Sequence, residues 1–224
     1  MFDKKTLSMH ELIDALDKNW NGYEELKNTI LKKAKYFGNN DNCSNEMAGK
    51  LFMSLDKWNN HENFLGRKYI FDNLIGYNEH QKFFGNSTKA TPDGRFDGDM
   101  ISFGICQSEG RDREGLTPLL ASVAKCDANS ILVGPSVINV LLDEQLVEND
   151  NNFKKLVYLF ESYFKLGGTH FQLTYVSKED LINAKKSVND YKTLRVRVSG
   201  FSDYFVLLNE DLQDDIIKRT EHVK

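Results

Sequence analysis

The chain reads Arg195-Val196-Arg197-Val198-Ser199-Gly200-Phe201-Ser202-Asp203-Tyr204-Phe205 near its C-terminal end, and this stretch decides how the fold is interpreted. Valines alternate with arginines before the glycine, which predicts a strand over 194–198 with valines on one face and arginines on the other. A second apolar run follows at 204–208. Because Gly200 separates the two runs, the stretch predicts a hairpin with a glycine at its tip.

Segments of strand type and helix type alternate upstream of this hairpin. Spacing of apolar residues and turn signals predict, in order, a helix at 117–125, a strand at 131–133, a helix at 153–165, a strand at 170–176 and a helix at 179–186. The first 60 residues predict helices alone: one capped by Ser8, with Glu11 three residues on, and two more at 23–36 and 46–58. Strands that alternate with helices at this spacing predict an α/β architecture.

Composition limits the classes of partner. The chain has 224 residues, 40% of them hydrophobic, which is enough for a sizeable core, and its formal net charge is −4. This charge gives no basic field for nucleic acid or a membrane surface. Residues 1–5 do not begin an apolar signal segment, and no run approaches the roughly 18 apolar residues of a membrane helix. We therefore expect a soluble, cytoplasmic protein without nucleic-acid or membrane partners.

The cysteines and histidines give no metal pattern. Cys43, Cys106 and Cys126 stand far apart, and their odd number argues against a disulfide framework. The five histidines are scattered along the chain. The sequence therefore predicts no metal site.

Several spaced motifs resemble those of the glycyl radical enzymes, the family of pyruvate formate-lyase and the radical dehydratases. Arg-Val-Ser-Gly-Phe-Ser at 197–202 resembles the radical-bearing loop, and Leu212 to His222 resembles the helix that closes it. Further upstream, Thr-Pro-Asp-Gly-Arg at 91–95 and Tyr-Phe-Lys-Leu-Gly-Gly-Thr-His-Phe-Gln at 163–172 resemble two other family segments. These motifs occur in the family's order, and nearly the whole chain aligns with the last quarter or third of a full-length member.

The resemblance implies a fold and its divisions. The chain would be the C-terminal portion of a β/α barrel, with a helical scaffold at 1–65 and a partial barrel at 66–224. Within the partial barrel, the radical loop would span 195–208 and the closing helix 209–222.

The resemblance also implies a site. Gly200 would carry a stored carbon-centred radical, which suits glycine because the absence of a Cβ lets the centre flatten and the loop tip adopt unusual backbone angles. An activating enzyme that uses S-adenosylmethionine and an iron–sulfur cluster would install the radical, and dioxygen would cut the chain there. The loop that this enzyme recognises would comprise Arg195, Arg197, Val198, Ser199, Phe201 and Ser202. The arginines would help the enzyme grip the loop, or alternatively face solvent or an acidic neighbour.

Two hypotheses about the function follow from the resemblance. In the first, the chain is a radical-bearing subunit or spare part of an anaerobic lyase or dehydratase. It is inactive alone, and a larger partner holds the thiyl cysteine and the substrate pocket. This reading arises because the family's catalytic cysteine lies upstream of the Thr-Pro-Asp-Gly-Arg segment, where the present sequence has no counterpart. In the second, the chain is a non-catalytic relative that binds the activating enzyme or a full-length enzyme. Exposed apolar surface is expected to cause association, either with the larger partner or with a second copy of the chain. A free-standing enzyme using one of the three cysteines is disfavoured by their positions.

Overall fold

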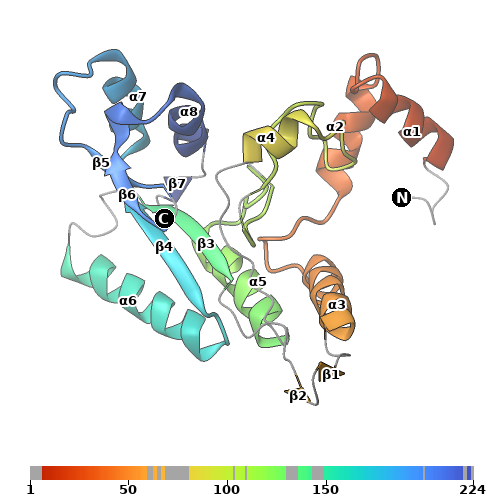
Figure 1. Ribbon diagram of the computed structural model, residues 1–224, viewed down its shortest axis with the longest axis horizontal. Coiled ribbons are helices and arrows are strands. Elements are labelled where there is room, and N and C mark those ends of the chain that lie inside the picture. The colour runs from red at the N-terminus through yellow and green to blue at the C-terminus, as the bar shows by residue number, and fades with distance from the viewer. Residues whose placement is uncertain are drawn as a thin grey trace. The chain divides into compact units, whose positions relative to one another are not determined.

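The computed structural model describes residues 7–59, 63–64, 67–68, 81–102, 104–108, 110–129, 136–142, 149–198, 200–218 and 221–222. The chain forms two compact units, drawn in Figure 1: the first is Met1–Lys35 with Glu79–Ile101, and the second is Tyr36–Asn78 with Ser102–Lys224. The segment 81–101 belongs with the N-terminal helices, and the chain from Tyr36 belongs with the second unit.

The first unit is helical. Its helices are α1 (Met9–Asp17), α2 (Glu24–Lys33) and α4 (Gln81–Asn86). Ser8 caps α1 as predicted, because its hydroxyl accepts a hydrogen bond of 3.1 Å from the Glu11 N–H. The helix predicted over 23–36 is shorter at both ends. A small core holds the unit together and consists of Leu7, Leu12, Ala15, Trp20, Ile30 and Ala90.

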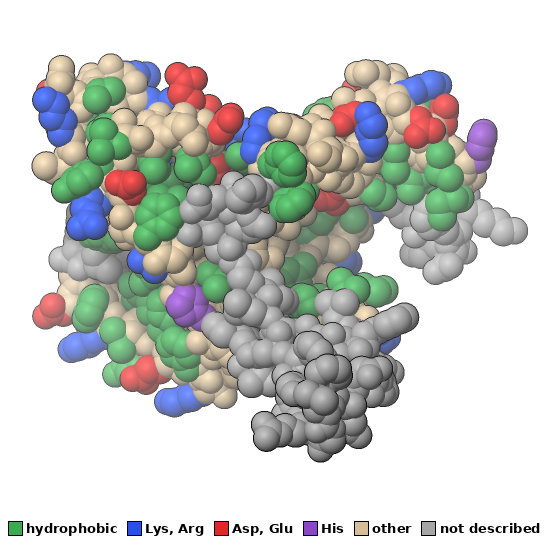
Figure 2. All heavy atoms as spheres, viewed as in Figure 1, with side chains coloured by type: hydrophobic (Ala, Val, Ile, Leu, Met, Phe, Trp, Pro, Cys, Tyr) green, Lys and Arg blue, Asp and Glu red, His purple; other side chains and the backbone are tan. Residues whose placement is uncertain are grey.

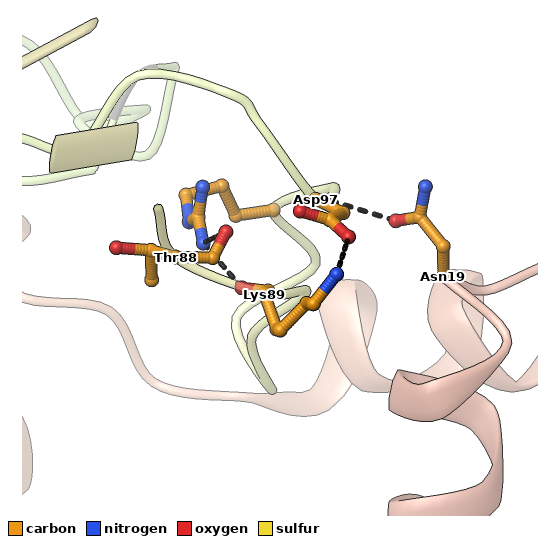
Figure 3. A network of polar contacts seen from close by, with 5 residues as sticks. Asn19, Thr88, Lys89 and Asp97 are labelled. Atoms are coloured by element: carbon orange, nitrogen blue, oxygen red, sulfur yellow. Dashed lines mark hydrogen bonds and ion pairs between the residues drawn. The ribbon is translucent and has the colours of Figure 1, made fainter. Parts of the chain in front are cut away.

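A polar network ties the segment after α4 to the end of α1, as Figure 3 shows. The Asp97 N–H donates to the side-chain oxygen of Asn19 at 2.7 Å, and Lys89 forms a 2.8 Å ion pair with Asp97. Arg95 donates to the Thr88 carbonyl at 2.9 Å and also to the Lys89 carbonyl. The bond between Asp97 and Asn19 joins residues 78 positions apart in the sequence and connects the two segments of the first unit.

The second unit is built on a parallel sheet. Its strands are β3 (Val137–Leu142), β4 (His170–Tyr175) and β7 (Glu221–His222), in the order β4-β3-β7. The predicted strand at 170–176 corresponds to β4, whereas β3 has no counterpart among the predicted strands. The predicted strand at 131–133 lies outside the described residues. Another pair of strands, β1 (Asn63–Phe64) and β2 (Arg67–Lys68), is antiparallel and separate from this sheet.

Three helices accompany the sheet: α3 (Asn42–Asn59), α5 (Leu116–Asn129) and α6 (Asp150–Lys165). Each corresponds to a predicted helix and extends beyond the predicted limits at one or both ends. Residues of α5 and α6 pack with alternate residues of β3 in one buried cluster, which we call cluster 1. Its buried members are Ile105, Leu116, Leu119, Leu120, Val123, Ala124, Cys126, Ile138, Val140, Leu142 and Tyr163.

A corner of two glycines connects α6 to β4. Gly167 has a φ of 104°, in the left-handed region that glycine adopts without a steric penalty. A Cβ added at Gly168 would lie less than 3.0 Å from the Tyr163 ring. The Tyr163 hydroxyl in turn donates to the His170 carbonyl at 3.0 Å. The geometry of this corner therefore requires glycine at both positions.

The C-terminal part of the second unit has a separate core. It contains α7 (Lys178–Lys186), β5 (Arg195–Arg197), β6 (Ser202–Tyr204), the 3₁₀ turn η2 (Phe205–Leu207) and α8 (Glu210–Lys218). Their buried residues form cluster 2, which consists of Val176, Leu181, Ala184, Val196, Val198, Phe205 and Ile216. The closing helix was predicted to reach residue 222, but α8 ends at Lys218. Residues Glu221–His222 instead pair with β3, where they lie opposite Leu141 and Leu142.

The architecture is thus of the predicted α/β class. Within the described part of the chain, no helix has both the length and the apolar character needed to cross a membrane.

Candidate functional site

The predicted hairpin is present. β5 and β6 are antiparallel, with Arg195 opposite Tyr204 and Arg197 opposite Ser202. The Val198 N–H donates to the Phe201 carbonyl at 3.0 Å and closes the ladder. Gly200 therefore lies in the two-residue connection at the tip, next to Ser199, which is outside the described residues.

The valines and arginines of β5 occupy opposite faces, as predicted. Val196 is 2% exposed and Val198 is fully buried, both in cluster 2. Arg195 is exposed, with its guanidinium 5.7 Å from the centre of the Tyr204 ring. Arg197 is half-buried, and its Nε donates to the side-chain oxygen of Gln172 at 3.4 Å. The two arginines thus share a face but have different surroundings.

The surroundings of Gly200 are open. A Cβ added there meets no other atom within 4 Å, and its φ lies outside the left-handed region. Phe201 and Ser202 beside it are also exposed, and Figure 2 shows exposed apolar side chains, in green, among charged ones over the region of β5 and β6. Within the described residues, neither packing nor backbone conformation requires a glycine at this tip.

Polar side chains line one face of β4 and reach the base of the hairpin. Gln172 and Thr174 are buried, and they alternate with Phe171, Leu173 and Tyr175 on the other face. The Gln172 amide nitrogen lies 3.3 Å from Nε2 of His170. Thr174 contacts the backbone of Arg197. Thr174 was not among the predicted site residues, although the pattern His-x-Gln-x-Thr within a strand indicates a polar face.

The cysteines do not approach Gly200. Cys43 lies exposed in the first turn of α3, Cys106 is partly buried, and Cys126 is buried with its Sγ 3.9 Å from the Asn45 carbonyl. No atom of these residues lies within 4 Å of a Cβ placed at Gly200. Among the described residues, no three His, Cys, Asp or Glu side chains are grouped so that they could hold a metal ion.

Fold and site together define an α/β domain that presents a glycine. The valines of the hairpin pack in cluster 2, while the tip that carries Gly200 has open surroundings.

Comparison with known protein families identifies this domain. Residues 101–206 match the family model described as "Glycine radical", and residues 1–75 match the one described as "Pyruvate formate lyase-like". The chain belongs to the glycyl radical enzyme family.

Individual relatives agree with this assignment. The chain is 34% identical over 222 residues to trans-4-hydroxy-L-proline dehydratase of Clostridioides difficile, covering 99% of the chain and 28% of the relative. It is 34% identical over 232 residues to isethionate sulfite-lyase of Desulfovibrio desulfuricans, covering 99% and 27%. Among solved structures, the B12-independent glycerol dehydratase of Clostridium butyricum superposes with a TM-score of 0.89 at 32% identity, covering 100% of the chain and 28% of that structure. The chain thus spans a little over a quarter of the length of these relatives, and its fold is that of the corresponding part of a glycyl radical enzyme barrel.

Proposed function

We propose that Gly200 is the residue that stores the radical, within an enzyme of the lyase or dehydratase type. The observation that carries this proposal is the open tip of the hairpin. Glycine stands there although neither contacts nor φ demand it. The hydrogen atoms on its Cα are therefore accessible to another molecule.

The chemistry proceeds by transfer of single hydrogen atoms. An activating enzyme, which uses S-adenosylmethionine and an iron–sulfur cluster, takes one hydrogen atom from the Gly200 Cα and leaves a carbon radical. In the catalytic cycle a cysteine thiol returns a hydrogen atom to this Cα, and the unpaired electron then resides on sulfur. The hairpin orients the glycine, and the portion of barrel that receives it shields the radical between these two events.

The thiol comes from outside the described residues. Cys43, Cys106 and Cys126 are all described, and none approaches the position of Gly200. We propose that a larger, cysteine-bearing portion of barrel receives the hairpin in trans and provides the substrate pocket. The exposed Phe201 and Tyr204 beside the tip supply apolar surface for that docking.

The reaction class follows from the relatives. Those matched include dehydratases and sulfite-lyases. We therefore propose radical-initiated elimination of a small leaving group, with the substrate chosen by the partner.

Oxygen sensitivity provides a test. After treatment with an activating enzyme and S-adenosylmethionine, the full chain is exposed to air and analysed by mass spectrometry. The proposal predicts two fragments that meet at Gly200, and no such fragments from Gly200→Ala or from wild type without the activating enzyme. Cleavage elsewhere, or an intact chain after treatment with an enzyme active on another substrate, would contradict it. The role in trans predicts that the activated chain restores turnover to an oxygen-cleaved relative, and that Gly200→Ala does not.

A further inference from the structure

The outer edge of β5 is bonded by a side chain. β5 pairs with β6 along one edge, and the described strands include no backbone partner for its other edge. There the Thr174 hydroxyl accepts from the Arg197 N–H at 3.3 Å and donates to the Arg197 carbonyl at 3.4 Å. One hydroxyl group thus takes the place of a neighbouring strand.

A second polar contact reaches the same residue. Nε of Arg197 donates to the Gln172 side chain at 3.4 Å, and Gln172 is in turn adjacent to His170. These three bonds are longer than most N–H···O and O–H···O bonds and are correspondingly weak. Arg197 precedes Gly200 by only three positions.

The apolar contacts of the hairpin are in cluster 2, away from the polar contacts of Arg197 with β4. Every buried residue of cluster 2 comes from position 176 or later, and every buried residue of cluster 1 comes from position 163 or earlier. The hairpin therefore shares a core with α7 and α8, and this core is separate from that of the sheet. Water can replace the polar contacts between the hairpin and the sheet at little cost in free energy, whereas it cannot replace buried apolar packing.

We propose that Thr174 is a positioning residue for the radical glycine, and that its hydroxyl, aided by Gln172, latches the hairpin to the sheet. This inference rests on the proposed role of Gly200, which needs two arrangements of the tip. The latched hairpin holds Gly200 at a fixed position for hydrogen exchange with a thiol. Once the bonds to Arg197 are broken, Val176 still joins the end of β4 to cluster 2, and the tip of the hairpin can move away from the sheet to reach the activating enzyme.

Hydrogen–deuterium exchange of the full chain measures the latch without any radical chemistry. The Arg197 amide reports directly, because it donates to Thr174. Thr174→Val keeps the side-chain shape and removes the hydroxyl, and we expect its Arg197 amide to exchange about tenfold faster. Thr174→Ser restores the hydroxyl and is expected to stay within about twofold of wild type.

Two further variants make the measurement specific. Thr169→Val removes a hydroxyl that accepts from the Ser136 N–H at 3.0 Å, and it should leave exchange in the hairpin unchanged. Gln172→Met removes the second contact and should accelerate exchange in the hairpin about threefold. The inference is overturned if Thr174→Val leaves the Arg197 amide unchanged, if Thr174→Ser exchanges as fast as Thr174→Val, or if the amides of β3 accelerate equally.

A radical measurement separates this inference from the proposed function. With an activating enzyme, Thr174→Val should gain the radical faster than wild type, yet support slower turnover with a cysteine-bearing partner. If no variant gains a radical while exchange responds as expected, the proposed function fails and the latch stands. If wild type gains the radical and exchange does not respond to Thr174→Val, the latch fails and the function stands.

Discussion

Two glycine-containing turns in the second unit differ in what they require of the residue. At the corner between α6 and β4, Gly167 needs positive φ, and Gly168 leaves no room for a Cβ beside the Tyr163 ring. At the hairpin tip, a Cβ on Gly200 meets open space. The first turn is explained by folding alone, whereas the second is not.

This difference separates structural from chemical reasons for a glycine. A glycine that the fold does not require can be replaced without unfolding the protein, so the replacement tests chemistry directly. The corner provides the contrast, because replacement there tests packing.

The largest effect on stability is expected at the corner. Gly168→Ala forces a Cβ against a buried ring, which should lower the free energy of unfolding by about 3 kcal/mol. Gly49→Ala is the matched control in α3, where no atom lies within 4 Å, and alanine in a helix should stabilise by about 0.5–1 kcal/mol. Chemical denaturation of both variants checks the pair. If the two variants had equal free energies of unfolding, packing at the corner would not require glycine at position 168.

A smaller effect is expected in the base of the hairpin. Val198→Ala removes two buried carbon atoms from cluster 2 and should cost about 2 kcal/mol. Arg195→Ala on the exposed face should cost less than about 1 kcal/mol, since it loses a solvent-exposed contact with an aromatic ring. The same denaturation experiment distinguishes them, and a costlier change at Arg195 would show that the exposed face, rather than the valine face, anchors the hairpin.

At the tip itself the expected change in stability is smaller still. Gly200→Ala should alter the free energy of unfolding by less than about 1 kcal/mol, with a gain favoured because alanine restricts the unfolded chain. Circular dichroism during thermal unfolding measures this. A large loss would mean that the fold does need the glycine, and the contrast with Gly168 would disappear.

The smallest effect concerns an exposed carboxylate in the first unit. Hydrogen bonds from Tyr23 and then Lys18 hold the pKa of Asp14 below its ordinary value of 3.8. Because the folded pKa is the lower one, the stabilisation is present above the unfolded pKa and is lost as pH falls through the folded pKa. Asp14→Asn should therefore unfold at a slightly lower temperature than wild type at pH 6, and the gap should close below about pH 4. A gap that widens in acid would contradict this assignment.

Local patterns made much of this molecule predictable. Alternating valines placed β5 and its buried face, and apolar spacing found α3, α5 and α6 within a few residues. The strand β3 was missed even though Val137 to Leu142 is almost wholly apolar. That run could have been found from its composition, because a short continuous apolar segment is typical of a strand in a parallel sheet.

Contacts between distant parts of the chain were not predictable. The strand β7 pairs with β3, and Glu221 lies opposite Leu141, which is 80 positions earlier in the chain. The bond between Asn19 and Asp97 joins the two segments of the first unit. At the site, the hairpin and the position of Gly200 followed from sequence. The role of Thr174 did not, because a threonine in a strand acquires it only when the edge of β5 lies opposite.

Electron paramagnetic resonance on the full chain is the most direct test of whether Gly200 stores a radical. The chain is incubated anaerobically with an activating enzyme and S-adenosylmethionine, as wild type, as wild type labelled with glycine deuterated at Cα, and as Gly200→Ala. We expect a doublet in wild type, collapse of its splitting in the labelled protein, and no signal from Gly200→Ala, which remains folded. A doublet that survives in Gly200→Ala, or no signal in wild type with an activating enzyme competent on another substrate, would contradict it.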